Sequence, residues 1–199
     1  MTLSIEQRMV YRIRAKGRGW VFSARHFLDF GSRKAVDLAL FRLANRGDIR
    51  RLGRGIYDYP KTSLTLGLLS PSIDAVAKEI AGKNNSKLKI TGAQAANALG
   101  LSTQVPARIV YLTDGPSRQM KIGRQTIILK HTSPKTMSTA GKGSGAVIEA
   151  LQYLEKENIN AEIIAKIKTT LSEPDKKELS KDISGAPDWL RPIINEIAT

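Results

Sequence analysis

Two stretches near the start of the chain carry apolar residues at helical spacing. The first predicts a helix over about residues 4–16, in which Ser4 and Gln7 have capping-box spacing, and the second predicts a helix that is capped by Ser32 and ended by Gly47. A short apolar run at 20–22 is predicted between them, followed by a short helix over 24–30 that Ser23 caps. The apolar stripe of the last of these helices is expected to pack on the first.

Two short strands are predicted directly after this last helix. Residues 49–52 and 56–59 are strand-like, a glycine lies on each side of Arg54 between them, and Pro60 ends the second strand. A helix followed by a basic β-hairpin is typical of a winged helix-turn-helix, in which the helix enters the major groove of DNA and the hairpin lies along the backbone. Residues 1–62 are therefore predicted to form a winged helix-turn-helix DNA-binding domain.

The rest of the chain mixes strand and helix patterns. Residues 61–69 are interpreted as a connection between domains, and the small, polar, glycine-rich residues 132–145 as a loop. Helices are predicted over 70–81, 92–99, 146–157, 161–171 and around an apolar stripe from Trp189 to Ile197, and strands over 88–90, 108–112, 120–122 and 124–130. Residues 63–199 are thus predicted to be a mixed α/β domain with a helical tail over about 145–199, which makes the fold class α+β.

Composition points to a folded protein with an anionic partner. The chain has 199 residues, 41% of them hydrophobic, and a formal net charge of +14. Such an excess suits a polyanion, because each neutralised phosphate releases counterions. The charge is concentrated at the start, since residues 1–60 hold 13 Lys and Arg, 11 of them Arg, against 5 Asp and Glu. Arginine is the better fork for phosphate and guanine, so the residue type agrees with the charge.

Other function classes find little support in the sequence. There is no cysteine and there are only two histidines, His26 and His131, so neither thiol chemistry nor a metal or catalytic cluster is expected. The stretch at 141–145 lacks the G-x-x-x-x-G-K-[ST] spacing of a phosphate loop. No apolar run is long enough to span a membrane, and residues 1–16 carry charges where a signal peptide is apolar. We therefore expect a cytoplasmic protein that is not an enzyme and uses no cofactor or metal.

The candidate DNA-binding residues lie on the helix after Ser32 and on the basic hairpin. Arg33 and Lys34 occupy the first turn of the helix, the end that meets base edges in this fold. Basic residues there oppose the helix dipole, which is easier to understand if a phosphate or a base lies nearby. The full set is Ser32, Arg33, Lys34, Asp37 and Arg42 on the helix, and Arg51, Arg54 and Tyr57 on the hairpin.

Each of these residues also has a plain structural interpretation. Charges on the helix can keep the protein soluble, and charges on an edge hairpin can prevent pairing with other strands. Arg50 and Arg51 point to opposite faces of their strand, so only one of them is expected to reach the groove. Tyr57 is as suited to packing as to a phosphate contact, and His26 is interpreted as structural or close to a phosphate.

Two runs of sequence resemble one known family. The run R-K-A-V-D-L-A-L-F-R-L-A-N-R-G-D-I-R-R-L-G-R-G-I-Y-D-Y-P (residues 33–60) is similar to the winged helix of the AbiEi-type antitoxins, which are the regulators of bacterial type IV toxin–antitoxin systems. The run T-G-A-Q-A-A-N-A-L-G-L-S-T-Q-V-P-A-R-I-V-Y-L-T-D-G (residues 91–115) resembles the following domain of that family. The resemblance covers about residues 5–135.

The resemblance implies a function in gene regulation. In that family the first domain binds repeats in its own promoter on double-stranded DNA and represses its operon, and the second domain opposes a nucleotidyltransferase toxin without a stable complex between the two proteins. Carried over to this chain, the recognition helix holds Arg33, Lys34 and Arg42, and the wing holds Arg51, Arg54 and Tyr57. Asn97 and Gln104 lie in the second run, and their roles are left open.

Alternatives from other classes stay open at this point. The positive charge outside the first domain fits an RNA-binding module in which residues 61–135 grip a structured RNA, and some winged-helix regulators have no toxin partner. An enzyme that uses His131 and the 141–145 stretch has the least support. A homodimer on repeated DNA is compatible with the amphipathic helices at the end of the chain.

Overall fold

The computed structural model describes residues 3–82, 84–103, 107–134 and 136–199, and it divides the chain into two compact units. The first unit runs to Asn85 and includes Met120–Arg124, and the second comprises Ser86–Gln119 and Gln125–Thr199. Beyond the expected boundary at residue 62, the first unit continues through one further helix.

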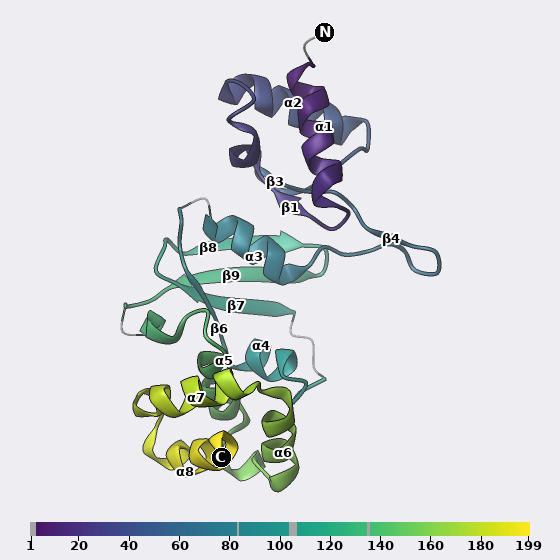
Figure 1. Cartoon of the computed structure of the whole chain (residues 1–199). Helices are drawn as coiled ribbons and strands as arrows, with labels where there is room; N and C mark the ends of the chain where they lie inside the picture. The colour runs from purple at the N-terminus through teal and green to yellow at the C-terminus, as the bar shows by residue number, and fades with distance from the viewer. Residues whose placement is uncertain (1–2, 83, 104–106, 135) are drawn as a thin grey trace. The chain divides into compact units, whose positions relative to one another are not determined.

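Helices and two small sheets make up the first unit (Figure 1). Its elements are α1 (Ile5–Lys16), β1 (Val21–Phe22), the 3₁₀ helix η1 (Ala24–Phe27), α2 (Arg33–Asn45), β2 (Arg50–Gly53), β3 (Ile56–Asp58), β4 (Thr62–Ser63), β5 (Gly67–Leu68) and α3 (Ile73–Gly82). The first sheet is antiparallel with the order β1-β3-β2, and the second pairs β4 with β5. The helix α2 is thus followed by the β2–β3 hairpin, in the order that the sequence predicts, and we call this hairpin the wing.

Capping residues set the ends of the two long helices as predicted. The Ser4 hydroxyl accepts a hydrogen bond from the Gln7 N–H at 3.2 Å, and the Gln7 side chain accepts one from the Ser4 N–H at 2.9 Å, which completes a capping box on α1. The Ser32 hydroxyl accepts a hydrogen bond from the Ala35 N–H at 3.3 Å at the start of α2. Gly47 follows α2 with a φ of +79°, a conformation that favours glycine.

The predicted helix over residues 24–30 is only partly correct. The segment forms the 3₁₀ helix η1, which ends at Phe27. The Ser23 hydroxyl makes no capping bond to this helix and instead forms a hydrogen bond with the carboxylate of Glu79. A longer α-helix therefore lacks the cap that the sequence assigned to it.

An aromatic cluster forms the core of the first unit. Phe22 and Phe27 are fully buried, and their rings meet edge to face with centroids 5.6 Å apart and planes at 88°. Met9 from α1 and Leu40 and Leu43 from α2 are buried beside them. The apolar stripe of α2 therefore packs on α1 as expected, and the opposite side of α2 remains exposed.

Residues 61–69 form a hairpin, which corrects their interpretation as a plain connection. The strands β4 and β5 pair antiparallel, and the Ser63 hydroxyl accepts a hydrogen bond from the Leu66 N–H at 3.3 Å within the turn. Gly67 has a φ of +67° where the chain reverses. The side chains of Leu64 and Leu66 are exposed, so this hairpin contributes little to the core. Figure 1 shows it projecting from the unit beside the label β4.

The remaining elements form a mixed sheet and a helical end. They are β6 (Leu88–Ile90), α4 (Gly92–Ala98), β7 (Arg108–Thr113), β8 (Arg118–Ile122), β9 (Gln125–His131), the 3₁₀ helix η2 (Thr136–Thr139), α5 (Gly143–Leu154), η3 (Lys156–Asn158), α6 (Ala161–Thr170), α7 (Glu173–Lys181), η4 (Asp182–Gly185), η5 (Asp188–Leu190) and α8 (Arg191–Ala198). The sheet has the order β6-β7-β9-β8, and β7 and β9 pair in parallel. The predicted strands are present, and the α+β fold class is confirmed.

The glycine-rich stretch at 132–145 is a loop only in part. It contains η2, and α5 begins at Gly143, so the last three residues of the stretch form the first turn of a helix. A Cβ atom on Gly145 would lie 2.4 Å from the carbonyl oxygen of Thr139. The glycine therefore lets α5 start against the preceding turn. This close packing requires glycine, although a glycine-rich composition by itself suggests a flexible loop.

The helical end has a hydrophobic core of its own. Leu151, Ile167, Leu179 and Ile194 are almost completely buried, and they come from α5, α6, α7 and α8 respectively. Each helix thus contributes one stripe to a shared centre, and the sequence predicts this apolar spacing for α5, α6 and α8 but not for α7. The expectation of a helical tail is confirmed.

Candidate nucleic-acid interface

The helix α2 has a buried side and an exposed side. Val36, Leu40 and Leu43 are completely buried against the core. Four exposed residues spaced four, three and four positions apart form a straight line on the opposite side, because such spacings return to the same face of a helix. We call this line the outer ridge of α2, and it comprises Lys34, Leu38, Phe41 and Asn45.

The predicted residues of α2 have different surroundings. Ser32 caps the helix, and the guanidinium of Arg33 donates a hydrogen bond to Asp37 at 2.8 Å in an exposed ion pair one turn apart. Lys34 and Arg42 are exposed, and neither forms an ion pair with any residue that the structure describes. Because the first turn of α2 contains no acidic residue, Lys34 adds to the positive end of the helix dipole. This end of the helix favours an anion.

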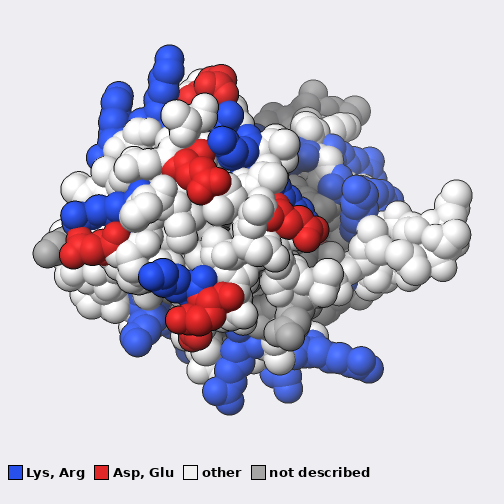
Figure 2. Space-filling model, turned by 90° about the horizontal axis from the view of Figure 1, so that it is seen from below, with Lys and Arg blue, Asp and Glu red and all other residues white. Residues whose placement is uncertain are grey.

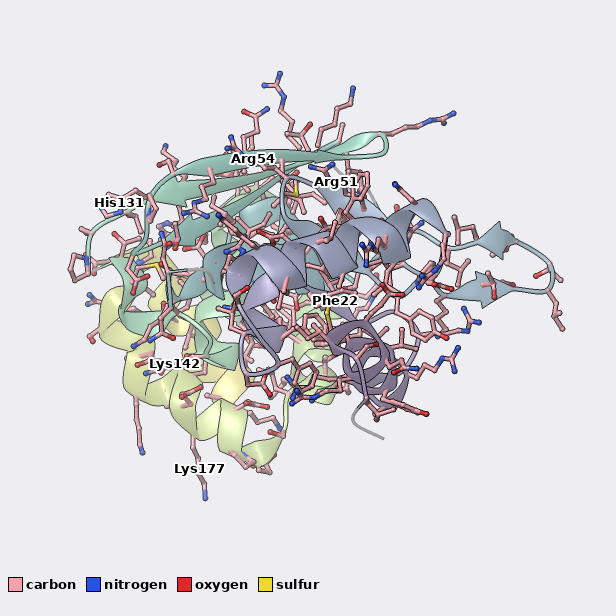
Figure 3. All side chains as sticks on the ribbon, turned by 90° about the horizontal axis from the view of Figure 1, so that it is seen from above. Phe22, Arg51, Arg54, His131, Lys142 and Lys177 are labelled. Atoms are coloured by element: carbon pink, nitrogen blue, oxygen red, sulfur yellow. The ribbon has the colours of Figure 1, made fainter. Side chains whose placement is uncertain are left out.

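The two neighbouring arginines of β2 point to opposite faces, as predicted. The guanidinium of Arg50 donates two hydrogen bonds to the carboxylate of Asp58, at 3.0 and 2.5 Å, and Asp58 is fully buried. Arg51 lies directly opposite Tyr57 on β3 and is exposed. The structure therefore assigns Arg50 to the interior of the unit, and leaves Arg51 on the surface of the wing (Figure 3).

The other two predicted residues of the wing differ in exposure. Arg54 is exposed in the turn between β2 and β3, followed by Gly55 with a φ of +70°. Tyr57 is half-buried, and its ring lies nearly parallel to that of Phe22, with centroids 6.3 Å apart. Of the two roles considered for Tyr57, packing is the one for which the structure provides a contact.

A groove joins the outer ridge of α2 to the wing. It has a volume of about 470 Å³ and is open to solvent. Its lining includes Phe41 and Asn45 from the outer ridge, and Arg51 and Tyr57 from the wing. The structure thus brings together the exposed side of α2 and the exposed face of β2, which the sequence could place only on separate elements.

The acidic residues near this surface are all taken up in ion pairs. Each of the five carboxylates in residues 1–60 lies within 3.0 Å of an arginine nitrogen. The pairs are Glu6 and Asp48 with Arg46, Asp29 with Arg12, Asp37 with Arg33, and Asp58 with Arg50. The excess positive charge of this segment is therefore carried by the other cations, among them Lys34, Arg42 and Arg51.

An ion-pair cluster connects η1 to α3 within the first unit. Arg25 donates two hydrogen bonds to the Glu79 carboxylate at 3.0 and 2.7 Å, and His26 Nε2 lies 3.0 Å from the same carboxylate. Burial alone would raise the pKa of Glu79, but the hydrogen bonds from His26, Arg25 and Ser23 outweigh it and hold this pKa below its ordinary value. Of the two roles considered for His26, the structural one has a contact in the structure.

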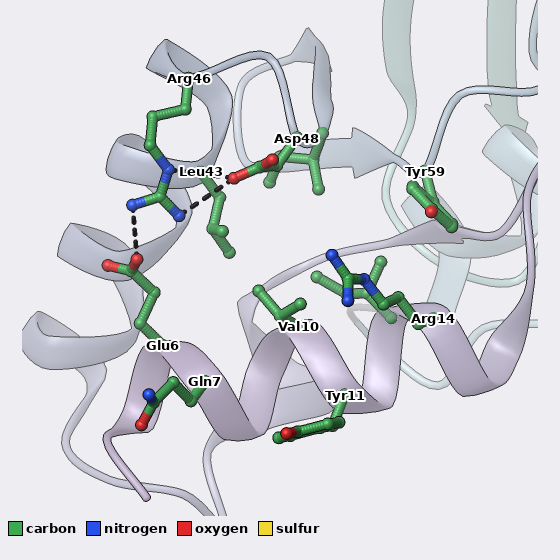
Figure 4. Close-up of a pocket in the computed structure, with 11 residues that line it drawn as sticks. Glu6, Gln7, Val10, Tyr11, Arg14, Leu43, Arg46, Asp48 and Tyr59 are labelled. Atoms are coloured by element: carbon green, nitrogen blue, oxygen red, sulfur yellow. Dashed lines mark hydrogen bonds and ion pairs between the residues drawn. The ribbon is translucent and has the colours of Figure 1, made fainter.

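A second cavity lies between α1 and the end of α2 (Figure 4). Its volume is about 370 Å³, and Arg46 lies on its wall between Glu6 at 2.6 Å and Asp48 at 3.0 Å. The hydrogen bonds that Arg46 donates to Glu6 and Asp48 raise the pKa of Arg46, so the guanidinium stays charged. These three charges satisfy one another, and the cavity offers a ligand no unpaired acid at that wall.

The sites considered for an enzyme are occupied by structural contacts. His131 Nδ1 lies 3.0 Å from the Gly115 carbonyl oxygen, and Lys142 donates to Asp182 at 3.0 Å. Within the described ranges, no three His, Asp or Glu side chains are grouped so that they could hold a metal ion. Asn97 donates to the Ser102 carbonyl at 3.1 Å, a contact that pins the end of α4, and Gln104 lies outside the described residues.

The helical end has a different distribution of charge. Its face in Figure 2 shows Lys and Arg side chains interleaved with Asp and Glu side chains. Several of these are direct pairs, such as Lys142 with Asp182 and Lys176 with Glu173. None of the helices in the described part of the chain combines the length and the apolar character needed to cross a bilayer.

Residues 8–179 match the profile of DUF6088, a family of unknown function. The chain belongs to this family. Because the match spans both units, the winged segment and the mixed sheet are parts of one DUF6088 architecture. The family description assigns no activity.

A solved structure is similar to this DUF6088 chain. It is the crystal structure of the Rv2827c protein from Mycobacterium tuberculosis, which is 14% identical in sequence. The similarity covers 98% of this chain and 76% of the other, with a TM-score of 0.45. Among curated proteins, no sequence matches the chain.

Three residues of the outer ridge are not among the candidate residues predicted from the sequence. Leu38, Phe41 and Asn45 lie there with Lys34, and Leu38 and Phe41 are 49% and 56% exposed. Their spacing from Lys34, opposite the buried stripe of α2, was the signal that could have identified them.

Proposed function

We propose that this DUF6088 protein is a DNA-binding transcriptional regulator. In this proposal α2 enters the major groove and the wing lies along the backbone, as in other winged helices. The observation that carries the proposal is a set of three exposed cations, Lys34, Arg42 and Arg51, on two elements that border one groove. Within the described residues none of the three has an ion-pair partner, while the nearby acids are paired with other arginines.

The test is binding of the full chain to the DNA directly upstream of its gene. The comparison ligands are a scrambled duplex of the same composition and total tRNA, each measured over a series of salt concentrations. We expect a preference for the upstream duplex that persists as the salt concentration rises, because base contacts depend less on counterion release than phosphate contacts do. Equal and salt-sensitive binding to all three ligands would contradict the proposal and favour an RNA-directed or architectural role.

A pair of variants separates the proposed surface from net charge. Lys34→Ala removes one exposed charge from the outer ridge, and Lys177→Ala removes one exposed charge from α7 in the helical end (Figure 3). We expect Lys34→Ala to reduce the preference for the upstream duplex and Lys177→Ala to leave it unchanged. If both variants lose affinity equally, the binding follows total charge and the proposed surface is wrong.

We further propose that the regulator is the antitoxin of a type IV toxin–antitoxin system and opposes a nucleotidyltransferase toxin. The support is the resemblance of residues 33–60 and 91–115 to the AbiEi-type antitoxins. The test is growth of cells that express the nucleotidyltransferase encoded next to this gene, with and without the full chain. Rescue by the chain, retained in the Lys34→Ala variant, is expected if neutralisation belongs to the second unit. Without such a neighbouring gene, or without rescue at equal expression, the protein is a regulator with no toxin partner.

A further inference from the structure

The centre of the outer ridge of α2 is apolar, although its surroundings are basic. Leu38 and Phe41 are adjacent on this ridge, one turn apart, with 49% and 56% of each side chain exposed. Lys34 precedes them by one turn, and Arg42 lies beside them on the helix. Two large apolar side chains at the middle of a cationic surface match a partner that offers both apolar groups and negative charge.

The major groove of DNA offers this combination. The C5 methyl of thymine is the large apolar group on the floor of that groove, and it is flanked by phosphates on both sides. Aromatic and aliphatic side chains contact this methyl, and an asparagine can form two hydrogen bonds with adenine, the base paired to thymine. The outer ridge carries Leu38, Phe41 and Asn45 in this order, so its chemistry matches A·T pairs.

The charge around the ridge argues against a second copy of this chain as the partner. In a symmetric contact with a second copy, Lys34, Arg42 and Arg51 would face the same cations of that copy, and like charges repel. The acids of residues 1–60 cannot compensate, because each is already paired with an arginine. A polyanion whose groove exposes methyl groups satisfies both the apolar centre and its cationic margin.

We propose that Leu38 and Phe41 read the methyl groups of thymines in the major groove, and that they thereby determine which DNA sequence this protein prefers. The inference rests on the proposed function, since it requires α2 to lie in that groove. Each methyl contact buries about one methylene equivalent of apolar surface, which corresponds to roughly a fourfold change in affinity. The protein should therefore distinguish thymine from uracil, which pairs identically but lacks the methyl.

The experiment uses the full chain and a duplex that it selects from a random DNA library. In that duplex each thymine is replaced in turn by deoxyuridine, and affinity is measured at fixed salt. We expect one or two positions at which the replacement weakens binding by about fourfold, with no effect elsewhere. This arm changes only the DNA, so its outcome does not depend on whether a variant folds.

Protein variants then assign the effect to the ridge. Phe41→Ala and Leu38→Ala should bind the thymine and uracil duplexes with equal affinity at the assigned positions, because the side chain that contacts the methyl is gone. Arg51→Ala is the control: it should bind both duplexes more weakly but keep the ratio between them. Both ridge side chains are about half exposed, so their replacement by alanine leaves the buried core intact.

The possible results separate the two proposals. If selection enriches no sequence, DNA-specific regulation itself is wrong. If a sequence is enriched but no uracil replacement weakens binding, the regulator stands and methyl reading by the ridge is overturned. If Phe41→Ala leaves the thymine-to-uracil ratio unchanged and instead abolishes a dimer detected by light scattering, the ridge is a protein contact and the inference is wrong.

Discussion

The two units of this chain use different cations to pair their least exposed carboxylates. In the first unit the buried side chains of Asp58 and Glu79 accept two hydrogen bonds each from an arginine. In the second unit the half-buried side chains of Glu149 and Asp182 are paired with lysines. A planar guanidinium donates hydrogen bonds to both oxygens of a carboxylate at once, whereas an ammonium acts as a point charge. Asp182 also accepts a hydrogen bond from the Ser144 hydroxyl.

This difference shows that the arginines of residues 1–60 have two roles, one in ion pairs within the fold and one on the exposed surface. Of the 11 arginines in residues 1–60, five are in ion pairs within the described structure: Arg12, Arg25, Arg33, Arg46 and Arg50. The pair of Arg33 lies exposed within α2, but the pairs of the other four arginines connect different segments of the chain, so these four serve the fold. A charge count from composition therefore overstates the surface that is available for binding.

The buried pair of the wing should show the largest effect on stability. Asp58→Ala leaves the guanidinium of Arg50 facing the interior without its carboxylate, and we expect the free energy of unfolding of the first unit to fall by about 3 kcal/mol. The measurement is urea unfolding followed by Trp20 fluorescence in a Trp189→Phe background. Asp37→Ala, which breaks an exposed pair, is the control and should change the value by no more than about 0.5 kcal/mol. Equal losses in the two variants would break the distinction between structural and surface arginines.

The cluster at Glu79 should show a smaller effect that depends on pH. Its pKa is lowered in the folded state, so its stabilising contribution is complete above the unfolded value of about 4.3 and is lost as the pH falls through the lower folded value. The free energy of unfolding should therefore drop between pH 6 and pH 3 less steeply in Glu79→Gln than in the parent chain. A parent slope in Glu79→Gln would show that the cluster does not link pH to stability.

Arg51 tests whether an exposed arginine of the first unit affects DNA binding and not stability. Arg51→Ala should leave the free energy of unfolding within about 0.5 kcal/mol of the parent value, because the side chain is exposed. The same variant should weaken binding to every duplex by about tenfold and reduce the salt slope by about one unit. Fluorescence anisotropy over a salt series measures both quantities. A loss of stability without a change in DNA affinity would place Arg51 with the structural arginines.

The smallest effect is expected in the second unit. Lys142→Met removes the ammonium that pairs with Asp182, but more than a third of the Lys142 side chain is exposed, and Ser144 still donates a hydrogen bond to that carboxylate at 2.6 Å. We expect the free energy of unfolding of this unit to fall by no more than about 1 kcal/mol. Trp189 fluorescence in a Trp20→Phe background reports on it. A loss as large as that of Asp58→Ala would remove the contrast between guanidinium and ammonium pairs.

Local patterns predicted the ends of helices well where residues close together in the sequence form the cap. The capping box at Ser4 and the cap at Ser32 involve neighbours three positions apart, so the sequence contains all of the information. Ser23 carries the same signal, yet its hydroxyl is used by Glu79, which is far away in the sequence. The hairpin at 61–69 and the helical start at Gly143 were missed, because alternating leucines and clustered glycines also suit connections and loops.

The candidate site was predictable as a set of elements but not as a surface. Periodicity placed Lys34 on the exposed side of its helix, and it placed Arg51 on the other face of its strand from Arg50. The structure agrees with both placements. The same periodicity places Phe41 on the outer ridge, but a search guided by charge does not select this apolar residue. That Phe41 and Arg51 line one groove depends on how the wing packs beside α2, which is a long-range property.

The cluster of Arg25, His26 and Glu79 also sets a lower limit on the piece of this chain that could be moved as a module. A gene fusion or an engineered reporter that takes residues 1–62 would carry the arginine and the histidine without the carboxylate that they share. A transplant that extends through α3 keeps all three partners. Recombination between proteins of this architecture should therefore be better tolerated after Gly82 than between the wing and α3.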